Sequence, residues 1–128
     1  MLTADQLIVH VIGDFMLQSD WMARSKTRDS FAAAVHAIIY AIPFLVFRPS
    51  PLAWFTIAGS HFLIDRWRLA RYVCWASGLL APPPYRSWTD CKQTGYAPEK
   101  EPWMSAWLLI IADNTLHVLI NALSLRRL

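Results

Sequence analysis

The fold is decided by the stretch Leu52–Asp65, which reads LAWFTIAGSHFLID and places His61 and Asp65 four residues apart in an apolar segment. Residues four apart lie on the same face of an α-helix, one side chain above the other. The same spacing recurs in two other apolar segments, as His10 with Asp14 and as Asp113 with His117. We therefore expect several helices, each of which turns a His/Asp face toward a common centre.

Apolar residues gather in four long blocks of this 128-residue chain, 55% of which is hydrophobic. Each block has, or nearly has, the roughly 20 residues that a membrane-spanning helix needs. The sequence therefore predicts an all-α fold, a four-helix transmembrane bundle forming a single integral membrane domain. The expected helices cover about residues 2–22, 31–47, 52–72 and 103–125, with a Pro-rich loop over residues 81–102. The blocks around His10 and His61 are the least hydrophobic, so a soluble helical bundle stays open as an alternative.

Basic residues concentrate in the first and third connections between these blocks, with fewer at the termini and in the second connection. By the positive-inside rule those two connections face the cytoplasm, which places both termini on the opposite side. A formal charge of +3 is too small to indicate a nucleic-acid partner. The expected partner is the lipid bilayer, and the sequence does not determine an oligomeric state.

Imidazole and carboxylate groups are ligands for zinc, manganese and iron. An Asp at the centre of a bilayer costs about 2.5–3.5 kcal/mol on insertion scales, so such groups must face inward and be compensated. A divalent cation would do this, with zinc preferred and manganese or iron as alternatives. Counted along the helices, all the candidate ligands can share one layer, provided that the third helix continues to about Tyr72. These candidates are His10, Asp14, His36, His61, Asp65, Asp113 and His117.

Different roles are expected within this set. The predicted direct ligands are His10, His61 and His117 with Asp14 and Asp65. Asp113 and His36 would complete a second metal site or act as the catalytic base. Predicted substrate-binding residues are Gln18, Lys26, Arg66 and Arg68, of which the arginines could hold an anionic lipid headgroup at the cytoplasmic rim. A lysine that snorkels to the membrane edge would also account for Lys26.

The motifs together resemble a known family. They run from His10-x3-Asp14-Phe15-x-Leu17-Gln18 to Trp21-Met22 and Lys26, then through His36, His61-x3-Asp65 and Asp113-Asn-x2-His117. This pattern is similar to that of the small bacterial and phage membrane proteins grouped as domain of unknown function 3307, outside the Pro-rich loop. The resemblance implies a multi-pass protein of the bacterial inner membrane, and the positive-inside assignment then places the termini in the periplasm. A more remote similarity links the His/Asp motifs to inner-membrane metal-dependent hydrolases.

Two functions follow from these expectations. The first is a membrane metalloprotein that hydrolyses a lipid-linked or membrane-accessible substrate, in which the metal activates a bound water. The second is a non-enzymatic membrane protein, an ion or proton conduit or a structural accessory, whose His/Asp pairs are interhelical hydrogen bonds. The apolar outer halves of the second and fourth blocks favour a closed site over a conduit.

Overall fold

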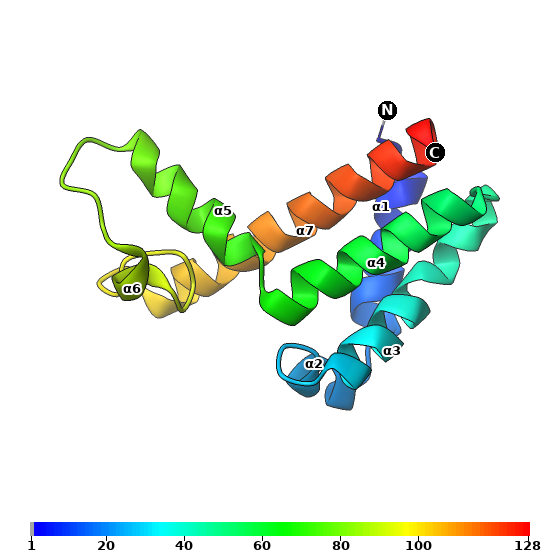
Figure 1. The fold of residues 1–128 in the computed structure, drawn as a ribbon, viewed down its shortest axis with the longest axis horizontal. Coiled ribbons are helices and arrows are strands. Elements are labelled where there is room, and N and C mark those ends of the chain that lie inside the picture. Colours follow the sequence, from blue (N-terminus) through cyan, green and yellow to red (C-terminus); the bar gives the residue numbers. More distant parts are fainter. Residues whose placement is uncertain (1) are drawn as a thin grey trace. The chain divides into compact units, whose positions relative to one another are not determined.

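The computed structural model describes residues 2–128 and, within that range, consists of helices without any strand (Figure 1). This confirms the predicted all-α class. The helices are α1 (Ala4–Val11), α2 (Asp20–Ser25), α3 (Ser30–Ala41), α4 (Pro51–Trp67), α5 (Ala70–Ser77), α6 (Trp88–Cys91) and α7 (Pro102–Arg127). A π-helical turn follows α1 (Ile12–Met16), and short 3₁₀ turns follow α3 (Pro43–Phe47) and α5 (Gly78–Leu80).

Where the sequence predicts one domain, the chain forms two compact units. The first runs from the N-terminus to Arg68 and resumes at His117–Leu128, and the second comprises Leu69–Leu116. Helix α7 therefore contributes its beginning to the second unit and its end to the first. All the predicted metal ligands except Asp113 belong to the first unit.

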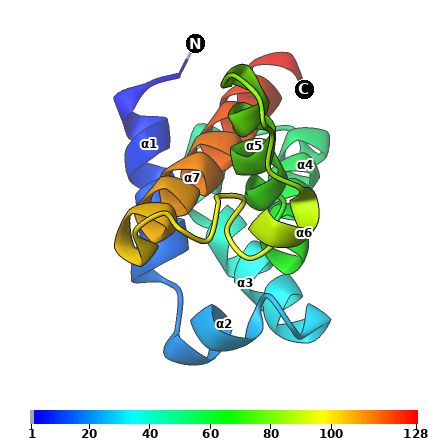
Figure 2. The ribbon, with the colours of Figure 1, turned by 90° about the vertical axis from the view of Figure 1, so that its left-hand side faces the viewer.

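Helices α3 and α4 lie side by side in the first unit (Figures 1 and 2). Six alanines of these two helices are buried. These are Ala32, Ala33, Ala37 and Ala41 of α3, and Ala53 and Ala58 of α4. Small side chains let helix backbones approach closely, as is common between helices in membranes. Trp54 adds a hydrogen bond from Nε1 to the Ala41 carbonyl at 2.9 Å.

The expected continuous helix over residues 2–22 is wrong in its extent. It ends in the π-helical turn, after which α2 starts separately beside the beginning of α3 (Figure 2). The side chain of Ser19 accepts a hydrogen bond from the backbone N–H of Met22 and so caps this new helix. Serine at such a position favours a helix start over a helix interior, which is why the long helix divides here.

The expected helix over residues 52–72 is also too long. Helix α4 ends at Trp67 because Arg68 takes the left-handed conformation, with φ 52°, and its N–H bonds back to the last turn. Such a residue satisfies the terminal carbonyl groups of a helix and stops it. The chain then starts again as α5, so the depth argument that required a helix to Tyr72 does not hold.

Two helical segments, Ser30–Phe47 and Pro102–Arg127, are long and apolar enough to cross a membrane. They correspond to the expected spans 31–47 and 103–125. The other two expected spans are shorter than the roughly 20 residues of a typical membrane-spanning helix. Helix α4 has 17 residues, or about 26 Å, and α1 has 8, or about 12 Å. The four expected spans are thus reduced to two candidates.

The Pro-rich segment 81–102 is folded against α5 in the second unit. Trp75 Nε1 donates to the Arg86 carbonyl at 3.1 Å, and Arg71 donates to the Lys92 carbonyl at 2.7 Å. Gly95 makes the close contact possible, because a Cβ there would lie 2.2 Å from the Arg71 carbonyl oxygen and φ is +86°. The segment therefore has a defined structure of its own.

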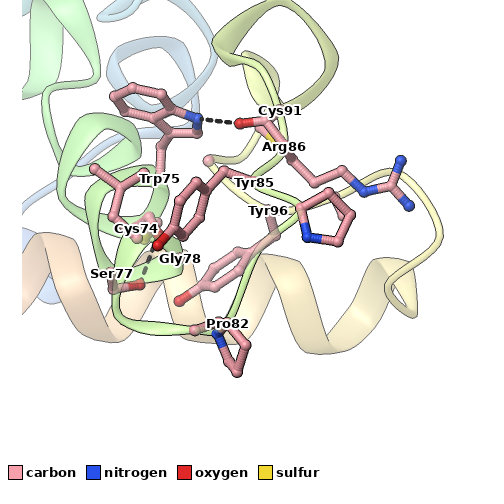
Figure 3. A pocket seen from close by; sticks show the side chains of 14 residues that line it. Cys74, Trp75, Ser77, Gly78, Pro82, Tyr85, Arg86, Cys91 and Tyr96 are labelled. Atoms are coloured by element: carbon pink, nitrogen blue, oxygen red, sulfur yellow. Dashed lines mark hydrogen bonds between the residues drawn. The ribbon is translucent and has the colours of Figure 1, made fainter.

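A cavity of about 200 Å³ lies between this segment and α5 (Figure 3). Cys74, Cys91 and Tyr96 are among the residues that line it, and both cysteines are free thiols. Burial raises the pKa of each thiol, and burial together with a hydrogen bond to Cys74 raises the pKa of Tyr96 to about 12. Burial thus disfavours the thiolate, which is the nucleophilic form of cysteine.

Candidate metal centre

Four side chains meet in the interior of the first unit. They are Asp14 from the π-helical turn, His36 from α3, and His61 and Asp65 from α4, and all are at most 5% exposed. Each offers one ligand atom, and the four atoms lie within 4.8 Å of one another. Segments separated in the chain thus bring two imidazoles and two carboxylates to one point.

The distances between these atoms match a metal coordination shell. Nε2 of His36 lies 3.2 Å from Asp14 Oδ1 and 3.4 Å from Asp65 Oδ2. Nε2 of His61 lies 3.7 and 3.2 Å from the same two oxygens, and the two nitrogens are 3.0 Å apart. Ligands at about 2.0–2.2 Å from a tetrahedral zinc ion would be about 3.3–3.6 Å apart. The residues present therefore fit a four-coordinate divalent metal.

An octahedral metal is also compatible with this cluster. Any four positions of an octahedron include at least one opposite pair, which would be about 4.2 Å apart for ligands at about 2.1 Å. Only the pair formed by Asp14 and Asp65 could take those places, since every other pair is closer than 3.8 Å, and its separation is within 4.8 Å. Two imidazoles and two carboxylates suit manganese or iron as well as zinc.

The π-helical turn brings Asp14 into the cluster. Gly13, within that turn, packs against α3 so closely that a Cβ would lie 2.7 Å from the Tyr40 carbonyl oxygen and 2.9 Å from Tyr40 Cδ2. A π turn inserts an extra residue and rotates the following side chains, and such turns are frequent at functional sites. The local irregularity and the glycine together determine where the Asp14 carboxylate lies.

His117, in the second half of α7, contacts the carboxylate oxygen of Asp65 that does not face the clustered histidines. Its Nε2 lies 3.3 Å from Asp65 Oδ1, whereas Asp65 Oδ2 faces the two clustered histidines. A partner on the second oxygen fixes the orientation of a carboxylate, as outer partners of metal ligands commonly do. His117 can therefore orient Asp65, and its predicted role as a direct ligand stays a prediction.

Tyr40 connects the predicted ligands to a hydrogen-bond network. Asn121 Nδ2 donates to the Tyr40 hydroxyl, which lies 2.8 Å from Nδ1 of His10. Since an amide nitrogen only donates, the Tyr40 proton is available for His10. The ring of Tyr40 stacks on that of His61 with centroids 3.6 Å apart and planes 15° apart. This fully buried tyrosine therefore holds the His61 imidazole in place.

His10 lies beside the four-residue cluster and not in it. Its Nδ1 bonds to Tyr40, and its ring centroid is 6.1 Å from that of His117. Asp113 lies on α7 one turn before His117, half-buried and in the second unit. Their predicted roles as ligands, and that of Asp113 as a base, stay predictions.

Lys26 is the charged group nearest to the cluster. Its Nζ lies 2.7 Å from Asp65 Oδ2 and 3.7 Å from Asp14 Oδ1. It is also 3.3 Å from Nε2 of His36. The side chain is 17% exposed, so the ammonium group lies at the edge of the site and not in open solvent. Lys26 therefore belongs to the site. A lysine that only snorkelled to the membrane edge would direct its ammonium group to solvent and away from these side chains.

The other predicted substrate-binding residues are placed differently. Arg66 donates from Nε to Ser30 Oγ at 3.1 Å and from Nη1 to the Thr27 carbonyl at 3.0 Å. It thus ties the turn that follows Lys26 to the end of α4. Arg68 is the left-handed residue that ends α4, and Gln18 is half-buried in the connection between the π-helical turn and α2. Their predicted contacts with a substrate stay predictions.

Sequence reasoning missed the roles of Tyr40 and Asn121. Tyr40 lies four residues after His36, and Asn121 lies four residues after His117, so both continue a histidine-bearing helix face. That spacing was the available signal, but a tyrosine in an apolar helix is also typical of a membrane interface. Only the packing of α1, α3 and α7 shows that both side chains point inward.

The family is decided by a match that covers almost the whole chain. Residues 2–126 match the family described as "Protein of unknown function (DUF3307)". The chain belongs to this family. The DUF3307 match includes the Pro-rich segment 81–102, which the motif resemblance left out. No curated protein and no solved structure matches the chain. The function must therefore be argued from the site.

Proposed function

We propose that the protein is a membrane metalloprotein that binds a divalent metal ion at Asp14, His36, His61 and Asp65. We further propose that it hydrolyses a lipid-linked or membrane-accessible substrate. The observation that carries the first step is the buried cluster of two imidazoles and two carboxylates, in which the nitrogens lie 3.0–3.7 Å from each other and from the oxygens and the two carboxylate oxygens lie within 4.8 Å of each other. Two buried carboxylates this close repel each other, and a divalent cation removes that repulsion.

The distribution of polarity in the first unit supports a location in a bilayer. Its largest fully buried side chains include all four histidines of the chain, whereas large apolar side chains such as Phe31, Val46 and Phe55 are 67–70% exposed. A soluble protein rarely exposes so much apolar surface, but polar groups that face inward with apolar groups outward are expected in lipid. We propose the bacterial inner membrane as the location of the protein, with the two candidate spans crossing the bilayer. The periplasmic position of the termini was inferred from the basic residues of a four-span arrangement and stays a prediction.

The residues at the proposed metal site would have different roles. The four clustered side chains would hold the metal, which when bound would lower the pKa of a water molecule and polarise the bond to be cleaved. His117 orients the Asp65 carboxylate, and Tyr40 holds the ring of His61. Lys26 supplies a positive charge at the edge of the site.

Elemental analysis by mass spectrometry of the detergent-purified protein tests the metal. Asp14→Ala and His61→Ala should lose an ion that the wild type holds in stoichiometric amount. Asp20→Ala is the matched control, because the Asp20 side chain is 77% exposed and pairs with its helix neighbour Arg24. If the metal is present, hydrolysis of phosphoester, ester and amide lipids can be compared between the same proteins.

A non-enzymatic function is the second candidate, favoured by one observation. Lys26 pairs with Asp65 at 2.7 Å, and His36 and His117 each contact an aspartate, so the buried charges have partners within the protein. Under this alternative the wild type would be metal-free and folded, and its thermal stability would not change when metal is added. Such a result would rule out the metal-dependent hydrolase.

A further inference from the structure

Lys26 contacts the same carboxylate oxygens that would hold the metal. Its Nζ lies 2.7 Å from Asp65 Oδ2 and 3.7 Å from Asp14 Oδ1. The same two oxygens face Nε2 of His36 and Nε2 of His61 at 3.2–3.7 Å. The Lys26 ammonium group is also 3.3 Å from Nε2 of His36. It is therefore an ion-pair partner of both carboxylates of the proposed centre.

The backbone around Lys26 holds its side chain at this place. Lys26 follows the end of α2, and its own N–H donates to the Met22 carbonyl at 2.9 Å. Arg66 donates from Nη1 to the carbonyl of the next residue, Thr27, at 3.0 Å. The lysine side chain is 17% exposed, and the two carboxylate side chains that it contacts are only 3% and 6% exposed. Carboxylates withdrawn from water need a compensating charge, and this lysine supplies one from within the chain.

A metal ion and the ammonium group would compete for these oxygens. A zinc ion would lie about 2.0–2.2 Å from Asp65 Oδ2, so it could be no more than about 5 Å from an ammonium group that lies 2.7 Å from the same oxygen. Two positive charges at that distance in a mostly buried place repel each other strongly. An ammonium group has donors and no acceptor, so Lys26 cannot join the ligands while it is charged. The ion must therefore displace the ammonium group or bind against its charge.

We propose that Lys26 is a built-in counterion that competes with the metal ion for Asp65 and Asp14. This inference rests on the proposed metal site and concerns the regulation of that site. The lysine stabilises the protein when no metal is bound, and it lowers the affinity of the centre for the ion. The centre then fills only when the free metal concentration is high enough to replace the lysine as the partner of the carboxylates.

The test measures zinc affinity and thermal stability on the purified full chain in detergent. Competition with a chromophoric chelator should show that Lys26→Met binds zinc about tenfold or more tightly than the wild type, because the competing charge is gone. After chelation of the metal, the same variant should melt about 5 °C or more below the wild type, because the carboxylates lose their partner. Lys26→Arg keeps the charge and should resemble the wild type in both measurements. Lys92→Met, on an exposed residue of the second unit, is the matched control.

Opposite changes in zinc affinity and in metal-free stability distinguish competition from other roles of Lys26. Zinc affinity that is unchanged or weaker in Lys26→Met would overturn the counterion role and leave the metal site standing. A chelated Lys26→Met protein that melts with the wild type would do the same. A wild type that binds no zinc would overturn the metal site and the competition with it. Should Lys26→Met unfold on chelation, Lys26→Gln keeps a hydrogen-bond donor, and its zinc affinity decides between the same outcomes.

Discussion

Replacing Gly13 with alanine should weaken metal binding without touching any ligand. The new Cβ would lie 2.7 Å from the Tyr40 carbonyl oxygen, whereas ordinary contacts begin at 3.4 Å. The π-helical turn and α3 must therefore separate by about 0.7 Å, several times the roughly 0.2 Å tolerance of metal–ligand distances. Overpacking of this kind costs about 1–3 kcal/mol. Asp14, the next residue, would move with the turn, so we expect the affinity for zinc to fall about tenfold or more.

Competition with a chromophoric chelator measures this affinity in detergent, and a thermal melt measures the loss of stability. Gly59→Ala is the control, because Gly59 is also in a helix of the first unit and a Cβ there meets nothing within 4 Å. Equal zinc affinity and equal melting temperature in the Gly13→Ala and Gly59→Ala proteins would refute the reasoning. It would mean that the position of Asp14 does not depend on the close approach of the two helices.

Three further predictions concern other parts of the molecule. Tyr40→Phe keeps the ring on His61 but removes the hydroxyl bonded to His10 and Asn121, so the free energy of unfolding should fall by about 1–3 kcal/mol with the metal retained; an unchanged melting temperature would contradict the network. Gly95→Ala should release the Pro-rich segment and speed its proteolysis, whereas Gly78→Ala, which has open space, should not; equal cleavage would count against the packing on α5. Chelation should lower the melting temperature of the wild type, because it removes about 4 kcal/mol from the free energy of unfolding if the free metal was 1,000 times Kd. The melting temperature of Asp14→Ala should not change, and no shift in the wild type would speak against a bound metal.

The sequence was most informative where a local spacing determines a geometry. His61 and Asp65 lie on one face because they are one helical turn apart, and both reach the cluster from α4. The start of α7 at Pro102 was predictable for a similar reason, since proline lacks the N–H group that the first turn of a helix leaves unpaired.

Helix boundaries were less predictable because competing local interactions decide them. Ser19 caps a new helix inside an apolar block, and Arg68 ends α4 although arginine is a good helix former. The pattern of hydrophobic residues alone predicts neither the start of α2 after Ser19 nor the end of α4 before Arg68. The arginine at the left-handed position closes backbone hydrogen bonds to Ile64 and Asp65 at the end of the helix.

By itself, the sequence determined the helical class, the inward-facing His/Asp pairs and the residue types that can bind a metal. The physical reason is that helix periodicity and the chemistry of imidazole and carboxylate are local properties. The tertiary structure decided which of these side chains meet. Packing of the π-helical turn, α3 and α4 brings Asp14 together with His36, His61 and Asp65. The same packing places His10 in hydrogen-bond distance of Tyr40 and Lys26 at the edge of the site. Those contacts link residues far apart in the chain, and no spacing within one helix specifies them.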